Sequence, residues 1–404
     1  MMQRPMRIAL IGAGGYGANY ASLFERRHGE GMLAFHAVAD PGGPALEETK
    51  ARLEGLGVSW HADYRRMFEE CAEDLDAVVI AAPIPLHLPM LEAALDRGLF
   101  VLLEKPPVPL IQDFLRVCQR PEATKVGVGF KLLADSNLWR LKEAMKNGAF
   151  GRIVSLRASG LWPRFDSYYR RATWAGRMIW REMPVFDGPA TNALAHIVHN
   201  LMFLAGATPA GFGIPGEMRG EVYRARPVES YDLCGLTGTF PDGPSFSGVF
   251  THAVERKTDW TLVVQGERGS ATLTKEGVVS DVPLGEQLPG RDLFEECWAD
   301  FHRFASGLQE RPLTTLQDCH GYVAATNAML VSSGGIRALP EQVVRRFEGA
   351  EDGGFDVEDI AGLAAESLRS GFSLTGCGAA WASDGRAVDA ARLTAIPFED
   401  FVSA

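Results

Sequence analysis

A short apolar segment, residues 6–11, runs directly into a glycine-rich turn, and this junction constrains the fold more than any other feature of the chain. The turn carries the spacing Gly12-x-Gly14-x-x-Gly17. The first glycine suits the tight turn after a strand, the second lets the backbone approach a pyrophosphate, and the third lets a helix pack closely. The N-terminal amides of that helix would face the phosphates. The junction therefore predicts a dinucleotide-binding turn.

The residues after the turn supply the context that this motif requires. Residues 18–27 have the pattern of a helix, and a second apolar strand, residues 33–39, ends in Asp40. An acid about 20 residues beyond the last glycine binds the ribose 2′-hydroxyl, and it repels the 2′-phosphate of NADP. Residues 41–44 contain no Arg or Lys that could neutralise such a phosphate. The sequence predicts NAD rather than NADP.

The length, the net charge and the cysteines of the chain limit the classes of protein to which it can belong. A chain of 404 residues exceeds what a single core usually supports, so we expect more than one domain. The net charge of −11 argues against nucleic acid or an anionic membrane surface as a partner. Six scattered cysteines without a C-x-x-C pair predict neither a metal site nor a disulfide framework, and favour a cytoplasmic protein. We interpret the apolar N-terminal stretch as a strand rather than a signal peptide or a membrane span.

Three segments are expected along the chain. In residues 1–130, apolar strands alternate with amphipathic helices, which predicts an α/β domain with a doubly wound parallel sheet. In residues 131–340, successive strands of mixed alternation between residues 217 and 279 predict an α+β domain with an open, mainly antiparallel sheet. Residues 341–404 are expected to form a C-terminal extension of unknown role.

One candidate catalytic residue follows the apolar strand at residues 100–103, in the sequence Glu104-Lys105-Pro106-Pro107. In a doubly wound sheet, ligands bind beyond the carboxyl ends of the strands. Lys105 would therefore project at the nicotinamide end of the cofactor. A surface lysine in a turn is the alternative interpretation.

A second group of candidates lies near the middle of the chain. Asp187-Gly188-Pro189-Ala190 predicts the start of a helix with proline in its first turn. On that helix Asn192, His196 and His199 would share one face. A polar core helix without a catalytic role is the alternative.

Residues 161–181 interleave tryptophan and tyrosine with arginine, which reverses the acidic character of the chain locally. Aromatic faces suit sugar rings, and arginines suit a carboxylate or phosphate on a substrate. The same residue types are also enriched at subunit contacts, so a loop at an interface remains an equal alternative. The candidate substrate residues are Trp162, Arg164, Tyr168, Trp174, Arg177, Asp187 and His199.

Taken together, the motifs resemble the Gfo/Idh/MocA family (glucose-fructose oxidoreductase, inositol dehydrogenase and rhizopine catabolism proteins). Besides the glycine turn and Asp40, the matching elements are residues 81–83 with His87, residues 104–106, residues 147–151 and the helix bearing His196. The resemblance extends over residues 6–335. It implies a Rossmann domain, a second domain with an open sheet, oxidoreductase activity on a sugar, polyol or related small molecule, and a homodimer or homotetramer.

The resemblance also assigns roles to three residues. Family function is usually carried by the lysine of Glu-Lys-Pro and by an aspartate and a histidine four residues apart, and Lys105 and His196 match these positions. Asn192 stands where the aspartate is expected. A carboxylate would raise the basicity of the imidazole, whereas an amide can only orient it. We interpret His196 as the base, Lys105 as the group that polarises the substrate oxygen, and Asn192 as a residue that sets the histidine tautomer or binds a neighbouring hydroxyl.

The predicted function is NAD-dependent oxidation of a carbohydrate-like alcohol without a metal ion. Two alternatives remain: a redox-neutral sugar lyase or glycosidase in which bound NAD⁺ transiently oxidises the substrate, and a non-catalytic NAD-binding regulator. The expected cofactor contacts gather at the glycine turn and at the ends of the following strands: Gly12, Gly14, Gly15, Tyr16, Gly17, Asp40, Ala82, Pro83, His87, Glu104 and Lys105.

Overall fold

The computed structural model describes residues 4–241, 243–286, 288–349 and 352–397, and the chain divides into two compact units. The first unit consists of residues 1–108, 116–130 and 294–317, and the second of residues 109–115, 131–293 and 318–404. Residues 294–317, which the sequence analysis assigned to the second domain, thus belong to the compact unit of the N-terminal domain. After residue 130 the chain forms most of the second unit. It returns to the first unit at residue 294 and continues in the second unit from residue 318.

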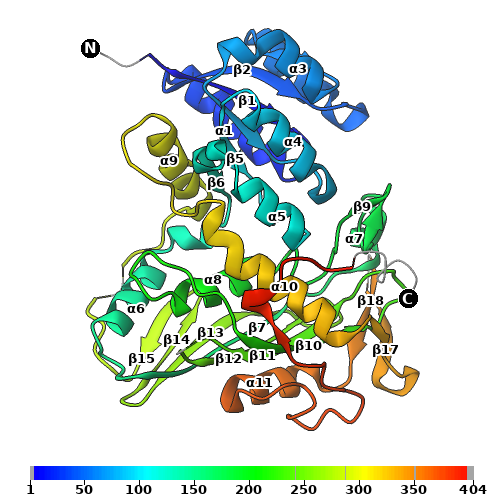
Figure 1. The fold of residues 1–404 in the computed structure, drawn as a ribbon. Helices are drawn as coiled ribbons and strands as arrows, with labels where there is room; N and C mark the ends of the chain where they lie inside the picture. The colour runs from blue at the N-terminus through cyan, green and yellow to red at the C-terminus, as the bar shows by residue number, and fades with distance from the viewer. Residues whose placement is uncertain (1–3, 242, 287, 350–351, 398–404) are drawn as a thin grey trace. The chain divides into compact units, whose positions relative to one another are not determined.

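The described part of the first unit contains a six-stranded parallel sheet in the order β3-β2-β1-β4-β5-β6 (Figure 1). The order reverses between β1 and β4, which creates the crevice where doubly wound sheets bind ligands. This confirms the predicted parallel α/β domain. The strands are β1 (Met6–Ile11), β2 (Leu33–Ala39), β3 (Ser59–His61), β4 (Ala77–Ile80), β5 (Phe100–Leu103) and β6 (Val126–Val128). The helices are α1 (Gly17–Gly29), α2 (Glu47–Gly55), α3 (Tyr64–Cys71), α4 (His87–Leu95) and, almost entirely, α9 (Leu293–Ala305), while α5 (Ile111–Cys118) crosses the boundary between the units.

Helix α9 belongs to the first unit because its aromatic side chains complete the core beside α1. Phe24 of α1 packs against Trp298, with the ring centroids 4.6 Å apart. Trp298, Phe301 and Phe304 are all buried in the same hydrophobic cluster as β1 and β2. Helix α9 carries an aromatic residue about once per turn, a pattern that shows an apolar face but not which sheet it covers.

A buried hydrogen bond links α1 to the end of β5. The Tyr20 hydroxyl donates to Glu104 Oε1 at 2.8 Å, and Glu104 Oε2 accepts the Lys105 amide at 3.1 Å. Burial and the nearby Glu104 carboxylate raise the pKa of Tyr20 well above its usual value, so the phenol keeps the proton it donates. This contact fixes the start of the loop that carries Lys105.

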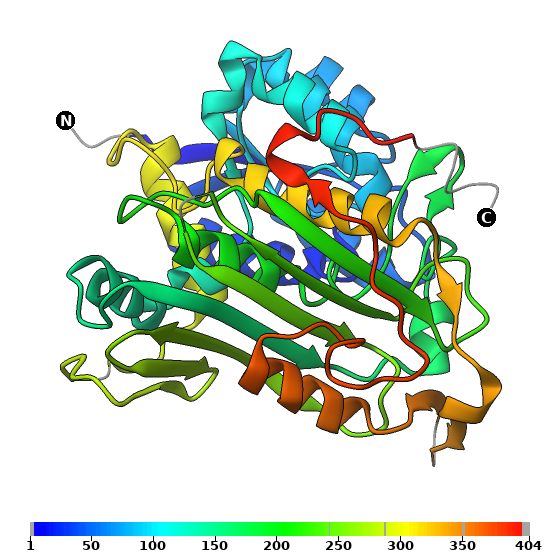
Figure 2. The same cartoon turned by 60° about the horizontal axis from the view of Figure 1, so that its bottom comes forward.

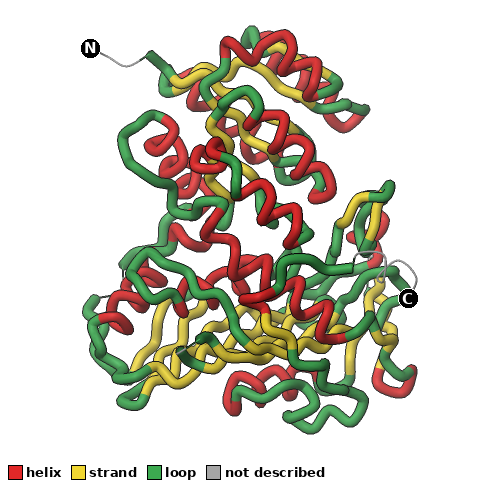
Figure 3. Tube along the Cα trace, viewed as in Figure 1, coloured by secondary structure: helices red, strands yellow, loops and turns green. Residues whose placement is uncertain are grey.

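The described part of the second unit contains a nine-stranded mixed sheet, which confirms the predicted mainly antiparallel domain (Figure 3). Its order is β15-β14-β13-β7-β12-β11-β10-β16, with β19 also paired to β10, and only the β7–β12 and β10–β16 pairs are parallel. The strands are β7 (Ile153–Leu161), β10 (Glu217–Arg224), β11 (Leu233–Thr239), β12 (Ser245–Thr251), β13 (Thr258–Gly266), β14 (Ser270–Thr274), β15 (Gly277–Ser280), β16 (Arg337–Ala338) and β19 (Val388–Asp389). The sequence Pro-Asp-Gly-Pro at residues 241–244 predicts a turn, but residue 242 lies outside the described residues.

Helices cover both faces of this sheet. Helices α8 (Ala195–Ala205) and α10 (His320–Ser333) lie on one face and α11 (Ile360–Ser370) on the other (Figures 1 and 2). Close packing on the α8 and α10 face requires glycine in the strands: a Cβ on Gly160 would approach Leu194 to 2.7 Å, and one on Gly220 would meet Met329 backbone at 2.5 Å. The remaining α-helices and strands of the described residues are α6 (Ser136–Lys146), α7 (Asp166–Arg170), and the hairpins β8 (Ile179–Trp180) with β9 (Met183–Pro184) and β17 (Val344–Glu348) with β18 (Gly353–Val357).

The described part of the C-terminal extension is built into the second unit. Leu374 and Ile360 join a buried cluster with Leu161 and Val249 of the sheet. The buried Glu221 carboxylate accepts the Leu374 amide at 3.0 Å, so a polar contact accompanies the apolar ones. The extension therefore adds to the core of the second unit. No helix in the described ranges combines the length and apolar character needed to cross a membrane.

We predict that Tyr20→Phe lowers the free energy of unfolding by about 2 kcal/mol, because the buried Glu104 carboxylate loses a hydrogen-bond donor. Urea unfolding followed by tryptophan fluorescence measures this, since Trp298 lies in the same core. Tyr64→Phe is the matched control: the Tyr64 side chain is mostly buried, and its hydroxyl has no hydrogen-bond partner among the described residues. Equal effects of the two substitutions would contradict the prediction.

Candidate active site

The glycine turn and Asp40 form a backbone cradle at the switch point of the parallel sheet. Gly12 has φ +87°, and a Cβ there would lie 2.8 Å from the Ala81 carbonyl oxygen. A Cβ on Gly17 would lie 1.9 Å from the Gly12 carbonyl oxygen, so both positions require glycine. In contrast, a Cβ on Gly14 would meet nothing closer than Leu46 at 3.6 Å, and Gly15 has no neighbour within 4 Å.

This open face and the adjacent carboxylate fit a dinucleotide. Within the described ranges, the Gly14 and Gly15 amides donate to no protein acceptor, so they are available to phosphate oxygens. Asp40 Oδ2 accepts the Ala13 amide and Oδ1 accepts the Gly42 amide, each at 2.8 Å. These bonds hold the carboxylate beside the turn, and each oxygen keeps acceptor capacity for a ribose hydroxyl.

His87 is buried between the loop after β4 and the loop after β5, which carries Lys105. The side chain is buried, with Nε2 2.9 Å from the Ala82 carbonyl oxygen and Nδ1 2.8 Å from that of Pro106. Burial lowers the pKa of His87, and the two carbonyl groups only partly offset this effect. Because Pro106 follows Lys105 directly, His87 and Glu104 together hold the backbone of the candidate catalytic lysine.

In the second unit, a buried carboxylate organises the candidate substrate residues. Asp187 accepts hydrogen bonds from the Gly176 amide at 2.7 Å, from Asn192 Nδ2 at 2.7 Å, and from the Tyr168 hydroxyl at 3.0 and 3.2 Å. Asn192 Nδ2 also lies 3.1 Å from the Tyr168 oxygen. Burial raises the pKa of Asp187, and the bonds from Asn192, Gly176 and Tyr168 oppose this shift. Asp187, Tyr168 and Asn192 thus form one hydrogen-bonded cluster.

The helix expected to start at Asp187 starts later, which corrects the predicted placement of Asn192. Helix α8 begins at Ala195, and residues 189–194 form consecutive turns. The buried Thr191 hydroxyl bonds to the Phe186 carbonyl oxygen, and the Asn192 amide bonds to the Gly188 carbonyl oxygen at 2.9 Å. These local bonds shape the turns that precede the helix. His196 and His199 lie on α8 as expected, whereas Asn192 lies before it and is directed toward Asp187.

The two histidines of α8 differ in surroundings. His196 is 9% exposed, whereas His199 is fully buried, 4.9 Å from the Phe212 ring by centroid distance. Burial lowers the pKa of His199 to about 3, so its ring stays neutral at physiological pH. His196 fits the candidate base better, and His199 fits the apolar core of the unit.

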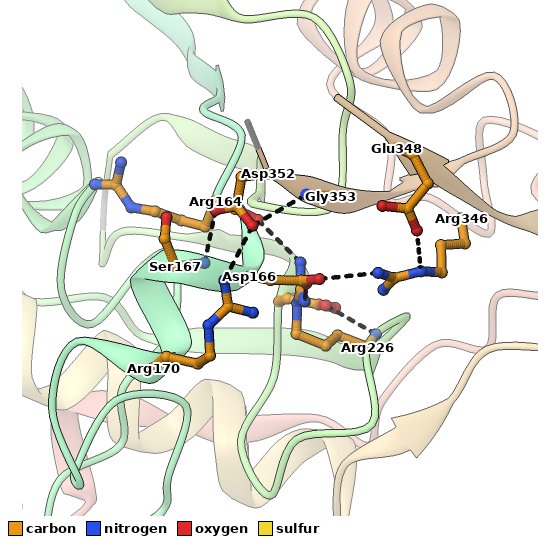
Figure 4. A network of polar contacts seen from close by, with 10 residues as sticks. Arg164, Asp166, Ser167, Arg170, Arg226, Arg346, Glu348, Asp352 and Gly353 are labelled. Atoms are coloured by element: carbon orange, nitrogen blue, oxygen red, sulfur yellow. Dashed lines mark hydrogen bonds and ion pairs between the residues drawn. The ribbon is translucent and has the colours of Figure 1, made fainter. Parts of the chain in front are cut away.

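The aromatic and basic segment is tied to the C-terminal extension by ion pairs (Figure 4). Asp166 on α7 contacts both the buried Arg226 and Arg346 of β17, the latter at 3.0 Å. Asp352 accepts the Ser167 amide at 2.7 Å. Arg226 also stacks on Tyr169, with 4.5 Å between its guanidinium carbon and the ring centroid. We call the ion-paired set of Asp166, Arg170, Arg226, Arg346 and Asp352 the α7 network.

Most of the other residues proposed from this segment have protein partners. Arg177 pairs with Glu229 at 3.5 Å, and Trp174 stacks with Arg171 at 5.2 Å. Trp162 lies at the end of β7, where Lys257 stacks on its ring at 4.9 Å. The segment that carries them contains a helix, a short hairpin and turns.

The sequence carries no signal that His252, Arg226 or the acids and arginines of β17 and β18 lie near this cluster. His252 is buried, lies 6.3 Å from the Tyr168 ring by centroid distance, and contacts the Trp162 carbonyl oxygen through Nδ1 at 2.7 Å. A single histidine at a strand end carries no local signal of such a contact. The Arg226–Asp166 ion pair joins residues far apart in the sequence, so local sequence patterns do not predict it.

We predict that Asn192→Asp destabilises the protein in a pH-dependent manner. It would place a second carboxylate beside that of Asp187, and two neighbouring carboxylates cannot both ionise easily. The pair would bind a proton in the folded state with a pKa above the unfolded value, so its contribution is lost as pH rises through that folded pKa. The loss in the free energy of unfolding should be about 1–3 kcal/mol larger at pH 8 than at pH 5.

Urea unfolding at the two pH values measures this difference. Asn192→Ala is the control, because it removes one donor to Asp187 without adding a charge and should show a smaller pH dependence. If Asn192→Asp is equally destabilising at both pH values, the two carboxylates do not interact as the geometry requires.

Comparisons with known proteins agree with the glycine turn and with the fold. Residues 6–130 match the model of the Gfo/Idh/MocA family, described as an oxidoreductase family with an NAD-binding Rossmann fold. Inositol 2-dehydrogenase 4 of Saccharopolyspora erythraea is 38% identical over 155 residues, or 38% of this chain and 44% of the relative. Inositol 2-dehydrogenase of Streptomyces avermitilis is 34% identical over 158 residues, with the same coverage. The chain thus spans less than half the length of these curated relatives.

Solved structures match over a larger part of the chain. The WlbA dehydrogenase of Bordetella pertussis, in complex with NADH and UDP-GlcNAcA, has a TM-score of 0.66 at 21% identity, covering 82% of this chain and 97% of that one. Levoglucosan dehydrogenase with NADH and L-sorbose has a TM-score of 0.66 at 17% identity, covering 81% and 96%. These likenesses establish the fold. Residues 6–130 thus match the NAD-binding Rossmann domain of the Gfo/Idh/MocA oxidoreductase family.

Proposed function

We propose that the protein is an NAD-dependent dehydrogenase that oxidises a CH–OH group of a sugar, polyol or related molecule. One observation carries the proposal: the open glycine turn, Asp40 and the braced Lys105 all lie at the carboxyl ends of strands in one parallel sheet. The match of residues 6–130 to an NAD-binding oxidoreductase family supports it, as do relatives named inositol dehydrogenases and neighbours solved with NADH.

In this proposal the glycine turn and the start of α1 bind the pyrophosphate, and Asp40 binds the adenosine ribose. When bound, NAD⁺ supplies the hydride acceptor. Gly14 and Gly15 contribute because their amides are open toward the ligand. Glu104, Tyr20 and His87 act indirectly by holding the backbone of Lys105.

Lys105 would donate a hydrogen bond to the oxygen of the reacting alcohol and polarise it. His196 is the proposed base that accepts the hydroxyl proton, since it is mostly buried but less so than His199. Asn192 orients Tyr168 and Asp187 through the bonds described above, so we assign it to binding of a neighbouring substrate hydroxyl. A screen of sugars and polyols for net NADH formation tests the activity as a whole.

The cofactor preference can be tested at Asp40. We expect calorimetry to show NAD binding at least about tenfold more tightly than NADP, because the Asp40 carboxylate repels a 2′-phosphate. Asp40→Asn should reduce this preference while leaving NADP binding no weaker. Asp63→Asn, at the exposed N-cap of α3, is the control and should leave the preference unchanged. Tighter binding of NADP to the wild type would refute the assignment.

The catalytic role of Lys105 is tested by Lys105→Met. We expect kcat to fall by a factor of about 10² to 10⁴, as is typical when a group that acts on the reacting proton is removed. NAD affinity, measured by calorimetry, should stay nearly unchanged, because the side chain acts on the substrate rather than on phosphate. Lys50→Met on α2 is the control. A variant with wild-type kcat would show that Lys105 is only a turn residue.

A further inference from the structure

We propose that the substrate site in the second unit includes an anion-binding subsite formed by Arg164 and Arg171 around Tyr168. It would take a carboxylate or phosphate group carried by the substrate. The inference rests on the proposed function and narrows its substrate class from neutral sugars and polyols to acidic ones, such as sugar acids or sugar phosphates.

The two arginines stack on the same aromatic ring. The guanidinium carbon of Arg171 lies 4.1 Å from the Tyr168 ring centroid, and that of Arg164 lies 4.9 Å from it. The hydroxyl of this ring belongs to the cluster with Asp187 and Asn192. Two positive charges thus lie at the ring whose hydroxyl reaches the candidate hydroxyl-binding amide.

Neither guanidinium has a carboxylate partner within the described ranges. The neighbouring acids are engaged elsewhere: Asp166 by Arg226 and Arg346, Asp352 by Arg170, and Glu229 by Arg177. Figure 4 shows the contrast, since the guanidinium groups of Arg170, Arg226 and Arg346 contact carboxylates and that of Arg164 does not. The carboxylates of the α7 network are therefore already ion-paired within the network. Arg164 and Arg171 can pair with an anion from outside the protein.

Buried polar atoms of Arg164, Trp162 and His252 also lack hydrogen-bond partners. Arg164 Nε and Trp162 Nε1 are shielded from solvent without a hydrogen-bond partner in the described structure, as is His252 Nε2. Unsatisfied buried polar atoms are costly, and in native proteins each calls for a specific explanation. If Nδ1 of the neutral His252 ring donates to the Trp162 carbonyl, Nε2 is an acceptor. The polar atoms of Arg164, Trp162 and His252 are therefore not all paired within the described protein.

The charge balance of the cluster favours the same occupant. Asp187 is the buried carboxylate at the tyrosine hydroxyl, and the charge of Arg171 helps to lower its pKa against the larger effect of burial. Two guanidinium groups against one carboxylate leave an excess of positive charge, in a chain whose net charge is −11. Such a local reversal attracts anions selectively.

Binding of matched acidic and neutral probes to the NAD-saturated full-length protein tests the proposal. The pairs are D-glucuronate with D-glucose, D-galacturonate with D-galactose, and myo-inositol 1-phosphate with myo-inositol, each measured by calorimetry. We expect the acidic member of at least one pair to bind about tenfold or more tightly than its neutral counterpart. The first two pairs report a carboxylate preference and the third a phosphate preference.

Arginine variants then locate the effect. Arg164→Gln and Arg171→Gln should each reduce affinity for the acidic probe about tenfold while leaving its neutral counterpart unaffected. Arg181→Gln is the control, because Arg181 lies in the same segment and also stacks on an aromatic ring, Trp180 at 4.4 Å, without an ion pair among the described residues. Thermal unfolding checks that each variant is folded.

Several results would overturn the subsite. They are the absence of an acidic preference in all three pairs, a preference that survives both arginine variants, or an equal loss in Arg181→Gln. NADH formation from neutral probes alone would retain the dehydrogenase proposal and reject the subsite. Arginine-dependent binding of acids without NADH formation from any probe would retain the subsite and reject the dehydrogenase.

Discussion

The candidate substrate site depends on one constraint: the buried Asp187 carboxylate must be hydrogen bonded. An isolated charge away from water is strongly unfavourable, and a buried carboxylate persists only with donors around it. The donors are the Gly176 amide, Asn192 and Tyr168, which come from three different parts of residues 168–192. Because these donors must reach one carboxylate, residues 168–192 adopt one defined arrangement, in which Tyr168 lies beside Asn192.

The C-terminal extension supports that arrangement from outside. Asp352 binds the first turn of α7, and Arg346 shares Asp166 with the buried Arg226. Ion pairs between exposed groups contribute little individually, but here they surround a buried guanidinium and act as a network. Residues distant in the sequence thereby hold the backbone that presents Arg164 and Tyr168. The extension thus supports the candidate substrate site in the second unit, although none of its residues belongs to the family resemblance.

In the first unit, too, the candidate ligand-binding residues differ from the residues that hold their backbone in place. Gly14 and Gly15 present open backbone, whereas Gly12 and Gly17 are required by contacts within the protein. Lys105 is held by Glu104 and His87, and Glu104 in turn depends on Tyr20 of α1. The acid and the proline carbonyl of Glu-Lys-Pro thus connect the loop of the candidate lysine to its surroundings.

The sequence alone determined the features that rest on local pattern. The apolar strands of residues 1–130, the glycine turn with Asp40, and the strands between residues 217 and 279 follow from periodicity and turn chemistry, which act over a few residues. Only the tertiary structure decided the rest. It placed residues 294–317 in the first unit, started α8 at Ala195, and joined Asp166 to Arg226 and Arg346. These outcomes depend on which distant side chains satisfy a buried charge or fill a core, and local pattern does not carry that information.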